Sequence, residues 1–125
     1  MSMRPWRVRP WSIALACVAL AACARPAQVD EAALRATVGE QPVVLLSAAW
    51  CGYCARQRED FRRWGVAFDE LDVESDPAGS RAYALLRGRG VPIVLVNEHR
   101  IHGYAPPRVR ELLAESGLLP ASASR

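Results

Sequence analysis

The chain has 125 residues, of which 51% are hydrophobic and 23% charged, a length that suits one domain and excludes two. The formal net charge is +3, from 16 basic residues, all of them arginine, against 13 acidic ones. Three arginines and no acidic residue lie in residues 1–22, so removing that segment leaves 13 basic and 13 acidic residues and a net charge of zero. We therefore predict no nucleic-acid binding.

The first 22 residues have the layout of an export signal. A start with three arginines is followed, over residues 11–22, by an apolar run that is short for a membrane span of about 20 residues. The run ends in Leu-Ala-Ala before Cys23, which resembles the bacterial lipobox. The resemblance implies a signal peptide over 1–22 and a lipid anchor on Cys23. An ordinary signal peptide cut nearby and a short uncleaved anchor are the alternatives.

A lipid on Cys23 would hold the exported domain at a membrane through a short tether, residues 23–28. Ala24 stands where inner-membrane lipoproteins of enteric bacteria carry Asp, which favours the outer membrane. We expect a periplasmic, lipid-anchored protein, at the outer membrane rather than the inner one.

The first half of the remaining chain reads as helix, strand and helix. Asp30 is placed to cap a helix that Gly39 ends, and residues 43–46 form an apolar run typical of a strand buried on both faces. The next helix ends at Gly65. Residues on its predicted inner face are Cys54, Gln57, Phe61 and Trp64, and those expected mostly outside are Arg56, Glu59, Asp60 and Arg63.

The second half adds three strands and two helices. Asp76 and Pro77 indicate a helix start, and Pro92 should open a strand because proline cannot donate to a sheet ladder. The first strands should pair in parallel through a crossover, and the last two as a hairpin. The expected elements are a strand at 66–73, a helix from 77, a strand at 91–96, a turn at 97–99, a strand at 100–103, and a helix from 106 to Gly117.

Two cysteines lie at the predicted strand-to-helix corner, where unpaired N–H groups and the helix dipole favour a thiolate on Cys51. A disulfide from Cys51 to Cys54 would restrict the unfolded chain little, so a redox role fits better than a structural one. Zinc needs four ligands, and the chain has no second Cys-x-x-Cys. We predict no metal site, with a site that also uses His99 or His102 as the alternative.

Three motifs in order resemble the thioredoxin superfamily, with a core of glutaredoxin size over about residues 30–116. They are Trp50-Cys51-Gly52-Tyr53-Cys54, then Val91-Pro92, then Gly103-Tyr104. The resemblance implies an α/β thioredoxin-like fold with a central four-stranded mixed sheet flanked by helices. We place this domain at residues 29–119 and expect a disordered tail over 120–125.

The resemblance also implies roles for the residues. Cys51 would be the exposed nucleophile and Cys54 the buried resolving thiol, and Pro92 would be cis. The implied substrate-binding residues are Trp50, Gly52, Tyr53, Val91 and Pro92. Ordinary surface cover is the alternative for the two aromatic side chains.

Two departures from the superfamily limit what is implied. Leu45 stands where thioredoxins carry a buried Asp that relays protons, so the resemblance does not identify a group that takes the proton of Cys54. Residues 48–50 and 102–105 lack the basic and acidic groups with which glutaredoxins hold glutathione, so glutathione dependence is not implied. Beyond the redox-active disulfide we predict no cofactor. His102 is either a proton donor, a substrate contact or a surface residue.

We therefore predict an exported, membrane-tethered, monomeric thiol–disulfide oxidoreductase that acts on protein thiols and disulfides with an unidentified membrane or periplasmic redox partner. The alternatives are a periplasmic copper-handling lipoprotein that uses Cys51, Cys54 and a histidine, and a thioredoxin-fold module without turnover. The direction of electron flow does not follow from the sequence, because dithiols of this kind span roughly −270 to −120 mV.

Overall fold

The computed structural model describes residue 2 and residues 28–123. Apart from residue 2, the expected signal peptide over 1–22 lies outside the described residues, as does the expected lipid site Cys23. Among the described residues, no helix has the length and apolar character needed to cross a membrane. The elements are α1 (Glu31–Val38), β1 (Val43–Ser47), α2 (Gly52–Trp64), β2 (Asp69–Asp72), α3 (Pro77–Leu85), β3 (Ile93–Val96), β4 (His99–His102) and α4 (Pro106–Glu115).

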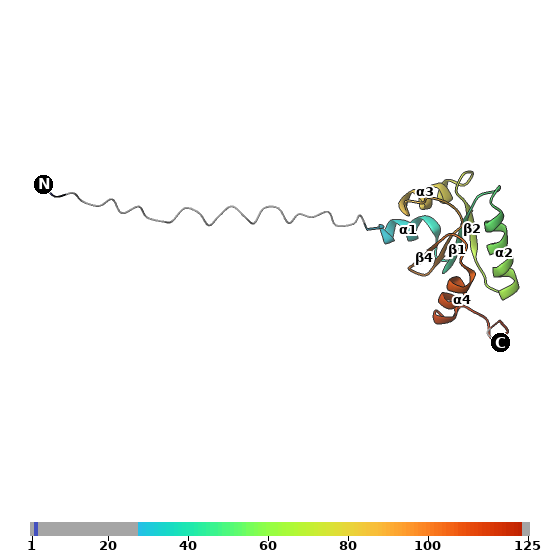
Figure 1. The fold of residues 1–125 in the computed structure, drawn as a ribbon. Helices are drawn as coiled ribbons and strands as arrows, with labels where there is room; N and C mark the ends of the chain where they lie inside the picture. Colours follow the sequence, from blue (N-terminus) through green and yellow to red (C-terminus); the bar gives the residue numbers. More distant parts are fainter. Residues whose placement is uncertain (1, 3–27, 124–125) are drawn as a thin grey trace.

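The four strands form one mixed sheet in the order β2-β1-β3-β4 (Figure 1). β1 and β2 are parallel, with Leu45 opposite Glu70, and α2 makes the crossover between them. β3 is antiparallel to both β1 and β4. The expected thioredoxin-like sheet, with a parallel first pair and a final hairpin, is therefore confirmed.

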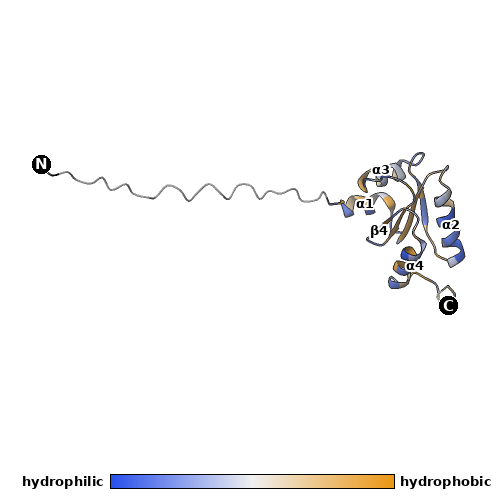
Figure 2. Cartoon of the chain, in the orientation of Figure 1, coloured by the Kyte–Doolittle hydropathy of each residue, from blue (hydrophilic) through white to orange (hydrophobic). Residues whose placement is uncertain are grey.

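Helices cover both faces of the sheet, with α1 and α3 on one face and α2 and α4 on the other (Figure 1). Apolar side chains alternate between these faces along β1, which is buried throughout, as expected for a strand between two helical layers. Figure 2 shows hydrophobic central strands, β1 and β3, between the helices. The core on the α2 side is built from Val43, Leu45, Phe61, Trp64, Val94, Val96, Val109, Leu112 and Leu113, among others.

Helix ends lie where local chemistry predicts them. The Asp30 carboxylate accepts a hydrogen bond from the Ala33 N–H at 2.9 Å, and the Asp76 carboxylate accepts one from the Ala78 N–H at 2.8 Å. Gly65 ends α2 with φ +68°, a conformation that glycine adopts without the steric cost of a Cβ. These caps fix where the dithiol helix ends and where the next one begins.

Several element boundaries differ from the predicted ones. The second strand begins at Asp69 instead of residue 66, the third at Ile93 instead of residue 91, and the fourth at His99, which the prediction placed in the turn. The tail was expected to be disordered from residue 120, but residues 120–123 form a turn, and the Arg110 guanidinium donates to the Ala123 carbonyl. Pro92 has no N–H to donate to a ladder, which fits a third strand that begins only at Ile93.

Gly79 lies where α3 meets the end of β2, and an added Cβ there would be 2.2 Å from the carbonyl oxygen of Asp72. We expect Gly79→Ala to lower the free energy of unfolding by about 1–3 kcal/mol, because backbone has to move. This clash should outweigh the gain in helix propensity of roughly 1 kcal/mol. Urea-induced unfolding of the disulfide form measures the change.

Gly90→Ala is the matched control, because nothing lies within 4 Å of a Cβ added at that exposed turn. It should change the free energy of unfolding by less than about 0.5 kcal/mol. Equal effects of the two substitutions would contradict the close approach of α3 to β2.

Candidate active site

The dithiol lies at the start of α2, directly beyond the carboxyl end of β1. Cys51 is the N-cap of α2, and its Sγ accepts a hydrogen bond from the Cys54 backbone N–H at 3.1 Å. Cys51 and Cys54 form a disulfide in this structure. A sulfur that caps a helix in this way faces the positive end of the helix dipole, so its thiolate is favoured once the disulfide is reduced.

The two sulfurs differ in their access to solvent. Cys54 is 0% exposed and Cys51 is 7% exposed, and both pack with Ala48 in a small buried cluster. A substrate can therefore reach only Cys51, and only across a narrow opening. This asymmetry fits the expected division into an attacking and a buried thiol, although Cys51 is less exposed than expected.

The turn before β3 lies against Cys51. The Val91–Pro92 peptide bond is cis, which confirms that implication of the resemblance. The Cys51 Sγ is 3.7 Å from the Val91 carbonyl oxygen. A disulfide sulfur carries no proton to donate, so this distance records proximity, and only the reduced thiol has a hydrogen to donate to that oxygen.

Two aromatic side chains flank the dithiol on the surface. Trp50 is 71% exposed and Tyr53 is 57% exposed, and these are the exposed large hydrophobic residues of the described chain. The Trp50 indole N–H donates to the Glu74 carboxylate at 2.9 Å, which ties the ring to the loop after β2. The two rings thus form an apolar rim on either side of a nearly buried disulfide.

Tyr53 is held by a polar network that sequence reasoning missed. Its ring stacks on Tyr104 with centroids 5.5 Å apart, and the Tyr104 hydroxyl donates to the Asp60 carboxylate at 2.8 Å. Asp60 also pairs with Arg63 and is only 4% exposed, so the expectation that it lies on the outside of the helix is wrong. Tyr104 follows β4 and is far away in sequence, so no local pattern could have indicated this contact.

The hydrogen bond to Asp60, together with desolvation, raises the pKa of the Tyr104 phenol above its ordinary value. Subtracting the absorbance titration of Tyr104→Phe from that of the wild type isolates the Tyr104 phenol, and we expect its midpoint above about 10. Asp60→Asn should lower this midpoint, because it removes the negative charge beside the phenol. Because the folded-state pKa is raised, the stability contributed by this phenol is present below the unfolded-state pKa and is lost as pH rises through the folded value. An unchanged midpoint in Asp60→Asn would contradict the assigned cause.

One arginine of α2 lies at the aromatic rim, and another joins the helix to the sheet. The Arg56 guanidinium lies 5.3 Å from the centroid of the Tyr53 ring, and a shallow hollow beside the dithiol is lined by Gly52, Tyr53 and Arg56. Arg58 instead donates to Glu70 on β2 at 2.7 Å, and this hydrogen bond lowers the pKa of the Glu70 carboxyl. Arg56 is thus the arginine at the hollow, whereas Arg58 joins α2 to the sheet.

The remaining residues considered from sequence lie in the core, on β4, where His102 pairs with Ile93 directly after the cis Pro92, or outside the described chain. Leu45 is fully buried in the core on the α2 side, and His99 and His102 are exposed at the two ends of β4. Within residues 28–123, no group of three or more His, Cys, Asp or Glu side chains is placed to hold a metal ion. Cys23 lies outside the described residues.

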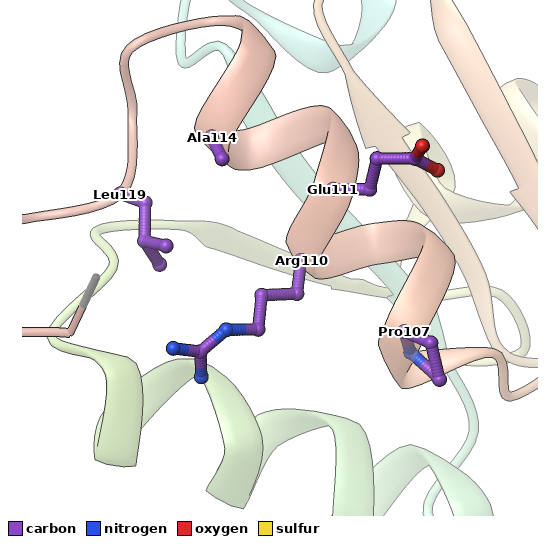
Figure 3. A pocket seen from close by; sticks show the side chains of 5 residues that line it. All are labelled: Pro107, Arg110, Glu111, Ala114 and Leu119. Carbon is purple, nitrogen blue, oxygen red and sulfur yellow. The ribbon is translucent and has the colours of Figure 1, made fainter. Parts of the chain in front are cut away.

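A second hollow lies beside α4, lined by Pro107, Arg110, Glu111, Ala114 and Leu119 (Figure 3). Figure 3 shows Arg110 pointing from α4 toward α2, and its guanidinium lies 5.7 Å from the centroid of the Trp64 ring. Trp64 ends α2, whereas the dithiol begins it. This hollow is therefore remote from the sulfurs, and its arginine serves packing.

Comparisons with known proteins agree with this geometry. The Glutaredoxin family model matches residues 43–101. The chain is 33% identical over 63 residues to a glutaredoxin from Pseudomonas aeruginosa, covering 50% of this chain and 75% of that protein. It is 29% identical over 98 residues to Glutaredoxin-C6 from Oryza sativa subsp. japonica, covering 70% and 88%. The crystal structure of a buckwheat glutaredoxin–glutathione complex matches with a TM-score of 0.57 and 26% identity, covering 72% of this chain and 94% of that one.

Proposed function

This chain belongs to the glutaredoxin family, and from that premise we propose that it is a thiol–disulfide oxidoreductase whose substrates are protein disulfides. The observation that carries the choice of protein substrates is the aromatic rim. Trp50 and Tyr53 leave large apolar surface in water on both sides of a nearly buried disulfide. Such a surface suits an extended polypeptide, which can cover the rings while its own disulfide reaches Cys51.

In the proposed reaction the reduced Cys51 thiolate attacks one sulfur of the substrate disulfide, and the other substrate sulfur leaves as a thiolate that takes up a proton. Cys54 then attacks the Cys51 sulfur of the mixed disulfide and releases the second substrate thiol. The protein ends with the Cys51–Cys54 disulfide, and two electrons have passed to the substrate. A dithiol donor must reduce the protein again, and the same steps run backward for substrate oxidation.

The chain itself supplies three aids to this exchange. The Cys54 N–H that donates to the Cys51 Sγ also stabilises a thiolate there, both as a nucleophile and as a leaving group. The Val91 carbonyl, 3.7 Å from that sulfur, marks where an extended substrate backbone would lie. The complete burial of Cys54 protects the resolving thiol from external oxidants.

Glutathione is the competing small substrate, because a glutaredoxin that resembles this chain was crystallised in complex with it. Tyr104 lies in the segment after β4 in which the resemblance places an acid that holds glutathione, and its hydroxyl is committed to Asp60. We infer that this chain acts on protein disulfides in preference to substrates that depend on glutathione.

The test compares two reactions of the reduced wild-type protein. With dithiothreitol as the reductant, we expect the protein to reduce the interchain disulfides of insulin faster than the uncatalysed reaction does. With glutathione as the reductant, we expect only weak reduction of hydroxyethyl disulfide. The reverse preference would overturn the assignment of protein substrates. The equilibrium potential of the dithiol then gives the direction of electron flow, with a reductase near −270 mV and a disulfide donor near −120 mV.

We also propose that residues 1–22 direct export, that Cys23 carries a lipid, and that residues 23–28 tether a domain at 29–119 to the periplasmic face of a membrane, the outer one in preference. The support is the order of charge, apolar run and Leu-Ala-Ala before Cys23. In a bacterial host, the wild type should fractionate with membranes and incorporate labelled palmitate, whereas Cys23→Ser should do neither. A wild type that remains soluble and unlabelled would overturn this proposal and leave the redox chemistry unaffected.

A further inference from the structure

We propose that Gln57 is a positioning residue for Cys54: its side-chain amide donates a hydrogen bond to the Cys54 sulfur in the reduced protein and thereby raises the reduction potential of the dithiol. This inference rests on the proposed function only in taking the dithiol to cycle between its two states.

Gln57 is a buried polar side chain whose amide is not hydrogen-bonded in the disulfide form. It is 0% exposed, and among the described residues neither its Nε2 nor its Oε1 has a hydrogen-bond partner. A buried amide without a partner is unfavourable, and such groups are rare in folded proteins. A second state of the protein in which the amide is satisfied would account for its presence.

The position of Gln57 on α2 points to Cys54 as that partner. The two residues are three apart, so they share one face of the helix, with Cβ atoms roughly 5–6 Å from each other. Long side chains on a helix lean toward its N-terminus, over the preceding turn. For Gln57 the preceding turn carries Cys54, which is equally buried.

Asp60, one turn further along α2, is also buried, but its carboxylate is already engaged by the Tyr104 hydroxyl and by Arg63. The adjacent Phe61 is apolar, and the core on this side of the sheet includes Val43 and Leu45 of β1. The sulfur at the start of the helix is therefore the acceptor toward which the lean of the Gln57 side chain directs the amide. In the disulfide form the amide donates no hydrogen bond to it.

Reduction changes what this sulfur can accept. Breaking the Cys51–Cys54 bond with two electrons, supplied by a substrate dithiol, leaves two thiols, or a thiol and a thiolate with one proton released. Because the thiolate is favoured at Cys51, the freed Cys54 sulfur is a thiol. It can accept a hydrogen bond from the Gln57 Nε2 and donate its own hydrogen to the Gln57 Oε1, whereas a disulfide sulfur has no hydrogen to donate. The Gln57 amide thus stabilises the reduced form over the oxidised form, and stabilising the reduced form makes a dithiol more oxidising.

The test measures the equilibrium potential of the full chain against a dithiothreitol buffer, with Cys17 and Cys23 replaced by serine so that Cys51 and Cys54 are the two remaining cysteines. Gln57→Met keeps the unbranched length and removes both polar atoms. We expect it to shift the redox equilibrium about tenfold toward the disulfide, which corresponds to a potential about 30 mV more negative. Gln57→Leu is the second variant, in case the first does not fold.

The matched control is Phe61→Leu, a second buried substitution on the same helix, one turn further from the dithiol. It should lower stability while changing the redox equilibrium by no more than about twofold, which corresponds to roughly 10 mV, because loss of packing there affects both redox states alike. A second readout follows the ultraviolet absorbance of the Cys54 thiolate against pH in a Cys51→Ser background, which needs no reagent to reach the buried sulfur. Gln57→Met should move that profile to higher pH, because the thiolate loses its donor.

The inference is overturned if both Gln57 variants keep the wild-type potential, or if Phe61→Leu shifts it equally. These outcomes are separable from failure of the proposed function. A wild type that exchanges no protein disulfides but shows the Gln57 shift loses the function and keeps the inference, whereas an active wild type with no shift keeps the function and loses the inference.

Discussion

Replacing Cys51 with serine should reduce the disulfide exchange of this protein to the uncatalysed rate, a loss of roughly two orders of magnitude or more. A serine hydroxyl is not ionised at neutral pH and cannot form a disulfide with a substrate. Cys54 cannot take over the attack, because its sulfur is fully buried behind Cys51. The rate of insulin reduction at equal concentrations of wild type and variant measures the effect.

Serine is close to cysteine in size, so the variant should fold, and its far-ultraviolet circular dichroism serves as the check. The substitution Cys23→Ser is the matched control, because it removes a different cysteine by the same change and should leave exchange by the purified protein unaltered. If disulfide exchange survives in Cys51→Ser and is lost in Cys23→Ser, then Cys23 and not Cys51 is the reactive cysteine, and the proposed site is overturned.

Features with local causes were predictable from the sequence. The buried strand β1 follows from an uninterrupted apolar run, and the starts of α1 and α3 follow from Asp30 and Asp76. The disulfide at the start of α2 follows from two cysteines that a strand leads into and a helix leads out of. In each case the residues that decide the structure are neighbours along the chain.

Features decided by distant partners were not predictable. Asp60 lies at the edge of the apolar stripe of α2, and only the approach of Tyr104, 44 residues later, makes it a buried acceptor. The extent of β2 is set by its pairing with β1, so Phe68 packs against the core without joining the sheet. Gln57 was correctly placed on the inner face, but its lack of a partner becomes visible only once every neighbouring side chain is in place.

Replacing Cys54 with serine should stop the reaction at its midpoint. Cys51 can still attack a substrate disulfide, but the described residues then hold no second cysteine to release the mixed disulfide, because Cys54 is the partner to which the Cys51 sulfur is bonded. We expect a single turnover, with about one substrate molecule bound covalently per protein. Non-reducing electrophoresis after mixing with oxidised protein substrate detects this adduct, and dithiothreitol should cleave its disulfide bond and release the substrate.

The trapped adduct separates the roles of the two cysteines and the two candidate substrates. Cys51→Ser should form none, since its sulfur makes the new bond. If added glutathione restores steady turnover to Cys54→Ser, then an external thiol reaches the Cys51 sulfur, and the aromatic rim made by Trp50 and Tyr53 does not exclude it. If only a protein dithiol restores turnover, the rim selects polypeptides, as proposed. Failure to trap any adduct while the wild type turns over would contradict attack by Cys51 and require a different order of steps.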